Sequence, residues 1–239
     1  MKHKPMDTTS TTRTTSLYLP EKKGTNQKED VPFFHYLGIY KTLDPYTIAR
    51  RCALPFDPTA SAFALGFMGT AYTVAFPDFA LQDPQGRVVQ NPAEKILLLH
   101  YLCEGTYVES QGKQRSYHEI PWGEVYYQNF KGRCITRLAY TFGKDLPRFR
   151  RIMEETSGLH AEPLTQGDAG YRFEFMTGLH ISFLVWAGDE EFPPSAQILF
   201  DDNVAFAFTA EDIAYAGEVI IKRLKEIQEK LSPSPRGLT

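Results

Sequence analysis

The sequence predicts an α+β domain, in which helices pack on an antiparallel sheet built from hairpins. Three observations lead to this prediction. Strand-like segments occur in pairs joined by tight turns, and helix-like segments lie in blocks between the pairs. Single strands that alternated with helices would instead indicate a parallel sheet. The 239-residue chain is also 42% hydrophobic, which is enough for a folded core.

Two hairpins are predicted at residues 62–76 and 171–185, where apolar side chains alternate on either side of a glycine. A Phe-Met pair precedes the turn in both segments, so a duplicated hairpin-plus-helix unit is one alternative for the architecture. Further strands are predicted at residues 198–200 and 204–208, around an Asp-Asp-Asn turn.

Capping residues mark the starts of four predicted helices. Asp44-Pro45, Asn91-Pro92 and the segment 145–147 each place a capping side chain before a proline. Thr209 and Asp212 approximate a capping box at the start of the last and longest helix. Helical spacing of apolar residues predicts further helices at residues 33–40, 122–130 and 135–142.

Both ends of the chain are predicted to be tails around a single domain. Residues 1–30 are rich in Thr, Ser and charged side chains, and residues 233–239 contain prolines and a glycine. Such segments bury too little apolar surface to offset the entropy lost on ordering. We therefore expect one α+β domain over residues 31–232.

Composition argues against several classes of protein. The chain has 26 basic and 29 acidic side chains and a net charge of −3, so nucleic-acid binding is not expected. No apolar stretch is long enough for a membrane span, and the Thr/Ser-rich start has no apolar signal core. The three cysteines are far apart, which predicts reduced thiols in a cytoplasmic protein and no cysteine-ligated metal.

The acidic segment after the second hairpin has two interpretations. Asp189 and Glu191 lie between apolar segments, and Asp201 ends the next strand. Carboxylates that converge could bind a hard cation such as magnesium or calcium. The spacing matches no known metal-binding loop, and a glycine followed by Asp and two prolines is typical of a tight turn, which is the simpler interpretation.

The histidines and nucleophiles give no recognisable motif. His100 lies in a helix that is apolar on all sides, where a core role is the simpler interpretation. His118 has Glu119 and Glu124 as neighbours, and His180 lies on the strand that leads to the acidic segment. The chain contains no GxSxG, no phosphate-binding glycine loop and no HxxxH pair.

The chain resembles an uncharacterised prokaryotic family, the domain of unknown function 3786, over about residues 32–230. The segments that carry the resemblance are Leu43-Asp44-Pro45, Phe67-Met68-Gly69-Thr70-Ala71-Tyr72-Thr73-Val74, Ile96-Leu97-Leu98-Leu99-His100-Tyr101-Leu102, Tyr117-His118-Glu119-Ile120-Pro121-Trp122-Gly123, Trp186-Ala187-Gly188-Asp189-Glu190-Glu191-Phe192-Pro193, Leu199-Phe200-Asp201 and Glu211-Asp212-Ile213.

The resemblance implies a single soluble domain of anaerobic bacteria and archaea. Some relatives look as though they carry an added four-cysteine iron–sulfur segment, in a setting of corrinoid and one-carbon metabolism. The first 30 residues of this chain contain no cysteine, so the resemblance implies no cluster here. It implies no catalytic residue and no particular cofactor. The polar positions that coincide with the family pattern are the candidate ligand-binding residues: His100, Tyr101, Asp189, Glu191 and Asp201.

Two functions follow as hypotheses. The first is a non-catalytic binding or accessory protein for a small molecule, a cofactor or a protein partner, because motifs for nucleophilic, phosphate or metal chemistry are lacking. The alternative is a metal-dependent enzyme with Asp189, Glu191 and Asp201 as ligands and His180 or His118 as the acid–base group. A homodimer formed through the aromatic helix near Trp122 is a third alternative.

Overall fold

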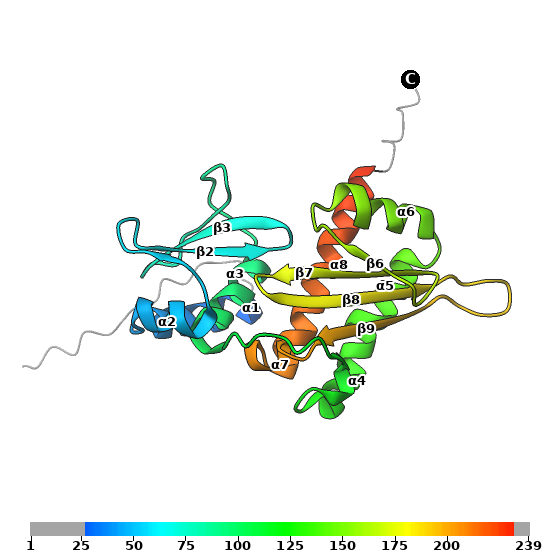
Figure 1. The fold of residues 1–239 in the computed structure, drawn as a ribbon, viewed down its shortest axis with the longest axis horizontal. Helices are drawn as coiled ribbons and strands as arrows, with labels where there is room; N and C mark the ends of the chain where they lie inside the picture. Colours follow the sequence, from blue (N-terminus) through cyan, green and yellow to red (C-terminus); the bar gives the residue numbers. More distant parts are fainter. Residues whose placement is uncertain (1–26, 232–239) are drawn as a thin grey trace, which may run out of the picture.

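An antiparallel sheet of nine strands organises the part of the chain that the computed structural model describes, residues 27–231 (Figure 1). The strand order is β4-β3-β2-β7-β8-β9-β5, with β1 beside β2 and β6 beside β7. Helices pack on this sheet, so the predicted α+β class is confirmed. The strands are β1 (Phe56–Asp57), β2 (Ala62–Phe67), β3 (Thr70–Ala75), β4 (Leu81–Gln82), β5 (Gln114–Ser116), β6 (Glu162–Leu164), β7 (Ala169–Met176), β8 (Leu179–Trp186) and β9 (Ser195–Asp201).

The helices begin where the capping residues predict. The Asp44 carboxylate accepts a hydrogen bond from the Thr47 amide at 2.8 Å, and the Asn91 side chain accepts one from the Ala93 amide at 3.1 Å. The main helices are α1 (Gln27–Tyr40), α2 (Pro45–Cys52), α3 (Pro92–Glu104), α4 (Gly123–Phe130), α5 (Arg137–Phe142), α6 (Leu146–Arg151), α7 (Val204–Ala207) and α8 (Ala210–Leu231). None of these helices is long and apolar enough to cross a membrane.

Two expectations need correction. The segment 204–208 was expected to be a strand, but Val204–Ala207 forms helix α7 because the chain turns back immediately after β9. Asn203 fixes that turn by donating to the carbonyls of Val108 and Gly178, both at 2.9 Å. Helix α1 begins at Gln27, so its first turn lies within the predicted tail. The rest of both predicted tails falls outside the described residues.

Both predicted hairpins are present, and they adjoin through their first strands. Strand β2 meets β7 at one residue pair, Phe67 with Met176, while β6 pairs with the other end of β7. A hydrogen bond of 2.7 Å from the Gly66 amide to the Thr177 hydroxyl lies beside this pair. The sheet is therefore nearly divided between β2 and β7, and we call this position the seam.

The two faces of the larger half of the sheet differ in polarity. Alternate residues of β7 to β9 point to the core and are buried, and helices α5 and α6 contact these strands. Figure 1 shows α8 crossing behind these strands, and the β8–β9 loop projecting from the end of the molecule opposite the β2–β3 hairpin. The core residues of this face are Tyr171, Phe173, Phe175, Ile181, Phe183, Ile198 and Phe200. The opposite face carries polar side chains, as described below.

The turn of the first hairpin requires a glycine. Met68 and Gly69 both have positive φ, 48° and 69°, as a two-residue hairpin turn of the right twist demands. A Cβ on Gly69 would lie 2.3 Å from the carbonyl oxygen of Gly158, so there is no room for a side chain.

We predict that Gly69→Ala destabilises the fold by about 2–4 kcal/mol, because it adds a backbone clash to the cost of a positive φ. Gly86→Ala is the matched control, since Gly86 has φ of 75° but no atom within 4 Å of its would-be Cβ. That variant is expected to lose only about 1 kcal/mol. Urea unfolding measures both, and equal losses would contradict the packing argument.

Candidate functional site

His100 on α3 is held by an acid on a distant helix. Its Nδ1 lies 2.9 Å from the Oδ1 of Asp212, which belongs to the first turn of α8. The side chains of both residues are 17% exposed. A carboxylate that accepts from Nδ1 places the proton of a neutral imidazole on that nitrogen, and leaves Nε2 as a hydrogen-bond acceptor.

Asp212 has a second role, because it also caps α8. Its Oδ2 accepts from the Thr209 hydroxyl at 2.7 Å and from the Thr209 amide at 3.3 Å. The Thr209 hydroxyl in turn accepts from the Asp212 amide at 3.2 Å. Burial raises the pKa of Asp212, but the hydrogen bonds from His100 and Thr209 outweigh it and leave the pKa below its usual range. The carboxylate is thus held ionised in a fixed position.

The other ring nitrogen of His100 is unusual. Nε2 is buried and has no hydrogen-bond partner among residues 27–231. The ring of Tyr36 from α1 lies against the imidazole, with 3.7 Å between ring centroids. Burial and the nearby carboxylate of Glu104 raise the pKa of Tyr36 to about 12, so its hydroxyl stays protonated. A buried polar atom without a partner is rare and calls for an explanation.

Two cavities meet at this histidine, and both include His100, Glu104, Thr209 and Asp212 in their walls. The first, which we call the charged arm, has a volume of about 950 Å³ and lies between α1, α3 and α8. The second, the apolar arm, has a volume of about 310 Å³. Further residues of the charged arm are Tyr36, Arg133, Glu218 and Lys222. Those of the apolar arm include Ile120, Pro121, Trp122, Ala205, Phe206 and Phe208.

Tyr101, the next predicted residue, points away from this place. Its side chain is fully buried, and its hydroxyl donates to the Cys52 carbonyl at 3.1 Å. The ring packs near Phe208, with 5.6 Å between centroids. We interpret Tyr101 as a core residue that fixes α3 against α2.

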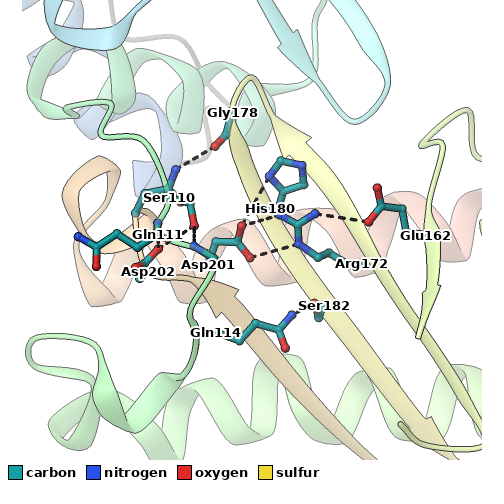
Figure 2. Close-up of polar contacts among 12 residues, drawn as sticks. Ser110, Gln111, Gln114, Glu162, Arg172, Gly178, His180, Ser182, Asp201 and Asp202 are labelled. Atoms are coloured by element: carbon teal, nitrogen blue, oxygen red, sulfur yellow. Dashed lines mark hydrogen bonds and ion pairs between the residues drawn. The ribbon is translucent and has the colours of Figure 1, made fainter. Parts of the chain in front are cut away.

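Asp201 belongs to a polar cluster on the other face of the sheet (Figure 2). Its carboxylate is 2% exposed and accepts two hydrogen bonds from Arg172, at 2.7 Å to Nη2 and 3.3 Å to Nε. Glu162 lies 3.5 Å from the same guanidinium, and His180 Nδ1 lies 3.8 Å from Asp201. Burial and the charge of Arg172 lower the pKa of His180. A cavity of about 360 Å³ at the seam includes Arg172, Glu162 and His180 in its walls.

The acidic segment forms a turn. Asp189 accepts hydrogen bonds from the amides of Glu191 and Phe192, at 2.9 and 2.7 Å, and these bonds lower its pKa. Glu191 is exposed. In the β8–β9 pairing, Trp186 faces Ser195 next to this turn, whereas Asp201 ends β9 at the opposite end. The two acids are therefore about 20 Å apart along the strand.

The expected ligand set of Asp189, Glu191 and Asp201 is therefore wrong, because the length of β9 separates its members. Within the described part of the chain, no three His, Cys, Asp or Glu side chains are placed to hold a metal ion together. Of the two acids expected near His118, Glu124 is its partner, with 2.5 Å between Oε2 and the histidine Nδ1. Glu119 instead accepts from Ser116 and Arg115.

Sequence reasoning missed the role of Asp212 in this site. The capping box signalled its position, but no local pattern indicates that it would meet His100, which is 112 residues away. Arg172 was missed for the same reason, since its partner Asp201 lies two strands away in the sheet.

The chain matches one known protein family over most of its length. The domain of unknown function DUF3786 matches residues 44–223. The chain belongs to this family. The match includes His100, Asp212 and Asp201, and it begins at Asp44, the N-cap residue of α2. Comparisons with curated proteins and with solved structures find no match.

We predict that Asp201→Asn destabilises the protein by about 2–4 kcal/mol, because it leaves the Arg172 guanidinium without its buried counter-charge. Asp189→Asn is the control, since an amide oxygen can still accept the two backbone hydrogen bonds of the turn, and we expect a change within about 0.5 kcal/mol. Chemical unfolding at neutral pH measures both. Similar losses of stability in the two variants would show that the buried Asp201 cluster contributes no more to stability than the exposed turn at Asp189.

Asp212 should make stability depend on pH. Its pKa is lowered in the folded state. The ionised form therefore contributes stability above the unfolded value of about 3.9, and this is lost as the pH falls through the folded value. Asp212→Asn is expected to be less stable than the native protein at pH 7. The difference in their free energies of unfolding should shrink as the pH falls below about 4. Glu211→Gln is the exposed control, and a constant gap in unfolding midpoints at pH 7 and 3 would contradict the prediction.

Proposed function

We propose that this DUF3786 domain is a non-catalytic binding protein that takes a small molecule or cofactor at His100. The observation that carries the proposal is the buried Nε2 of His100, which has no partner among the described residues although its other nitrogen is fixed by Asp212. Leaving a buried polar group unpaired costs about 1–3 kcal/mol. A ligand that donates a hydrogen bond to Nε2 removes that cost.

The surroundings support binding rather than a purely structural role. Two cavities of about 950 and 310 Å³ converge on the histidine, and such volumes are typical of small-molecule sites. Access to Nε2 requires the Tyr36 ring to move, since it lies against the imidazole. Tyr36 lies on α1 and also lines the charged arm.

A corrinoid is the second candidate ligand, in the setting of anaerobic one-carbon metabolism that the family resemblance implies. A cobalt ion already held by a corrin ring needs only a single ligand from the protein. A histidine whose second nitrogen is bonded to a carboxylate is the usual form of a metal-binding imidazole. His100 with Asp212 has this form, and the charged arm offers space beside it. A cytoplasmic location is part of the proposal, supported by three buried cysteines without disulfides.

Thermal unfolding with a library of phenols, alcohols, amines and amides, together with aquacobinamide, tests the proposal. We expect a subset of hydrogen-bond donors, or the corrinoid, to stabilise the native protein. His100→Asn should abolish the shift, while its amide can still donate to Asp212. His160→Asn is the control, because His160 is exposed and its φ of 49° suits asparagine.

For the corrinoid, binding through Nε2 would change the cobalt absorption spectrum, and this change would be lost in His100→Asn. The proposal fails if no compound distinguishes the native protein from His100→Asn in either measurement.

A further inference from the structure

The apolar arm opens between large aromatic side chains that are exposed without a structural reason. Trp122 is 75% exposed and Phe206 is 58% exposed, and both line the cavity. Val125, in the first turn of α4 next to Trp122, is 71% exposed. Exposed aromatics beside a cavity indicate a surface that gains from a bound partner.

The backbone conformation of Trp122 also supports a binding role for this surface. Residues 120–123 form a turn closed by a hydrogen bond of 2.8 Å from the Gly123 amide to the Ile120 carbonyl. Trp122 occupies its third position with φ of 66°, where glycine or asparagine is favoured. A glycine would adopt this conformation without steric cost. Strain of this kind is typically retained at ligand-binding positions.

The same arm is also lined by the His100–Asp212 pair, whose side chains are each 17% exposed, far less than Trp122 and Phe206. Two acids line this arm. Asp212 is bonded to His100 and Thr209, and Glu104 interacts with the Tyr36 hydroxyl, so both carboxylates already have a partner. Apart from the four residues shared with the charged arm, every residue that lines the apolar arm is apolar. The arm thus fits an uncharged ring at its mouth and one hydrogen-bond donor at its inner end.

We propose that the apolar arm binds a small aromatic molecule with an O–H or N–H group, such as a phenol or an indole. The ring lies against Trp122 and Phe206, and the donor reaches His100 Nε2 once the Tyr36 ring has moved off the imidazole. This inference rests on the proposed function and adds the ligand class. A protein partner fits less well, because a standard interface involves about 20–30 residues on each side. The exposed large apolar side chains at the arm are only Trp122, Val125 and Phe206 within the described chain, with Tyr126 partly exposed.

Fluorine NMR of two matched probes tests the inference. 4-Fluorophenol has the donor, whereas 4-fluoroanisole has a ring of the same kind without it. We expect 4-fluorophenol to bind the native full-length protein, and 4-fluoroanisole to bind about tenfold more weakly for want of one hydrogen bond. Trp122→Gly should weaken 4-fluorophenol about five- to tenfold by removing the aromatic wall.

The variants are chosen to remain folded. Trp122→Gly relieves a positive φ, so its melting temperature should not fall below that of the native protein. Phe192→Ala is the matched control, because it removes an aromatic side chain that is 67% exposed on the β8–β9 loop. Its affinity for 4-fluorophenol should equal that of the native protein.

Other outcomes separate this inference from the proposed function. If other donors bind in a His100-dependent way but 4-fluorophenol does not bind, or binds equally to Trp122→Gly, only the ligand class is wrong. If 4-fluorophenol binding is also unchanged in His100→Asn, the proposed function loses its support as well. A dimer in sedimentation velocity that disappears in Trp122→Gly would show that a second copy covers the arm, and would overturn the inference.

Discussion

The near division of the sheet between β2 and β7 is the constraint on which the rest of the structure depends. A single residue pair, Phe67 with Met176, joins the two halves within the sheet. Helix α8 adds a further connection between them. Its Arg223 pairs with Glu94 of α3 at 3.2 Å and donates to the hydroxyls of Tyr72 and Thr70 on β3. Its Asp212 holds His100 of the same helix α3.

This arrangement explains why the candidate site lies where it does. Ligand sites are common where two packed units meet, since the surfaces there are concave and only partly filled. The Asp212 carboxylate caps α8, links α8 to α3 and orients the His100 imidazole. The position of His100 is therefore a consequence of how the two halves are joined. The Asp201 cluster lies beside the cavity at the seam, and its buried acid is fully paired. There, Arg172 satisfies the buried acid with two hydrogen bonds, which is sufficient reason for its presence.

Local chemistry determined what could be predicted from the sequence. Helix starts were predictable because a capping side chain and a proline lie within three residues of each other, as at Asp44 and Asn91. Hairpins were predictable from alternation around glycine. The short strands, such as β5 and β6, have only three residues each and no pattern to detect. The site could be predicted only in part. His100 was a candidate, but its partner, its cavities and the separation of Asp189 from Asp201 depend on the tertiary arrangement.

The central claim is that Asp212 fixes the proton of His100 on Nδ1 and leaves Nε2 as a buried acceptor for a ligand. The protonation state of each imidazole nitrogen can be read from ¹⁵N chemical shifts in a long-range proton–nitrogen correlation spectrum, with His100 assigned by its absence in His100→Asn. The account predicts that the neutral imidazole of His100 in the unliganded protein has its proton on Nδ1. A dominant Nε2–H form would contradict it, because Nε2 could then no longer accept a hydrogen bond or bind a metal ion without losing its proton.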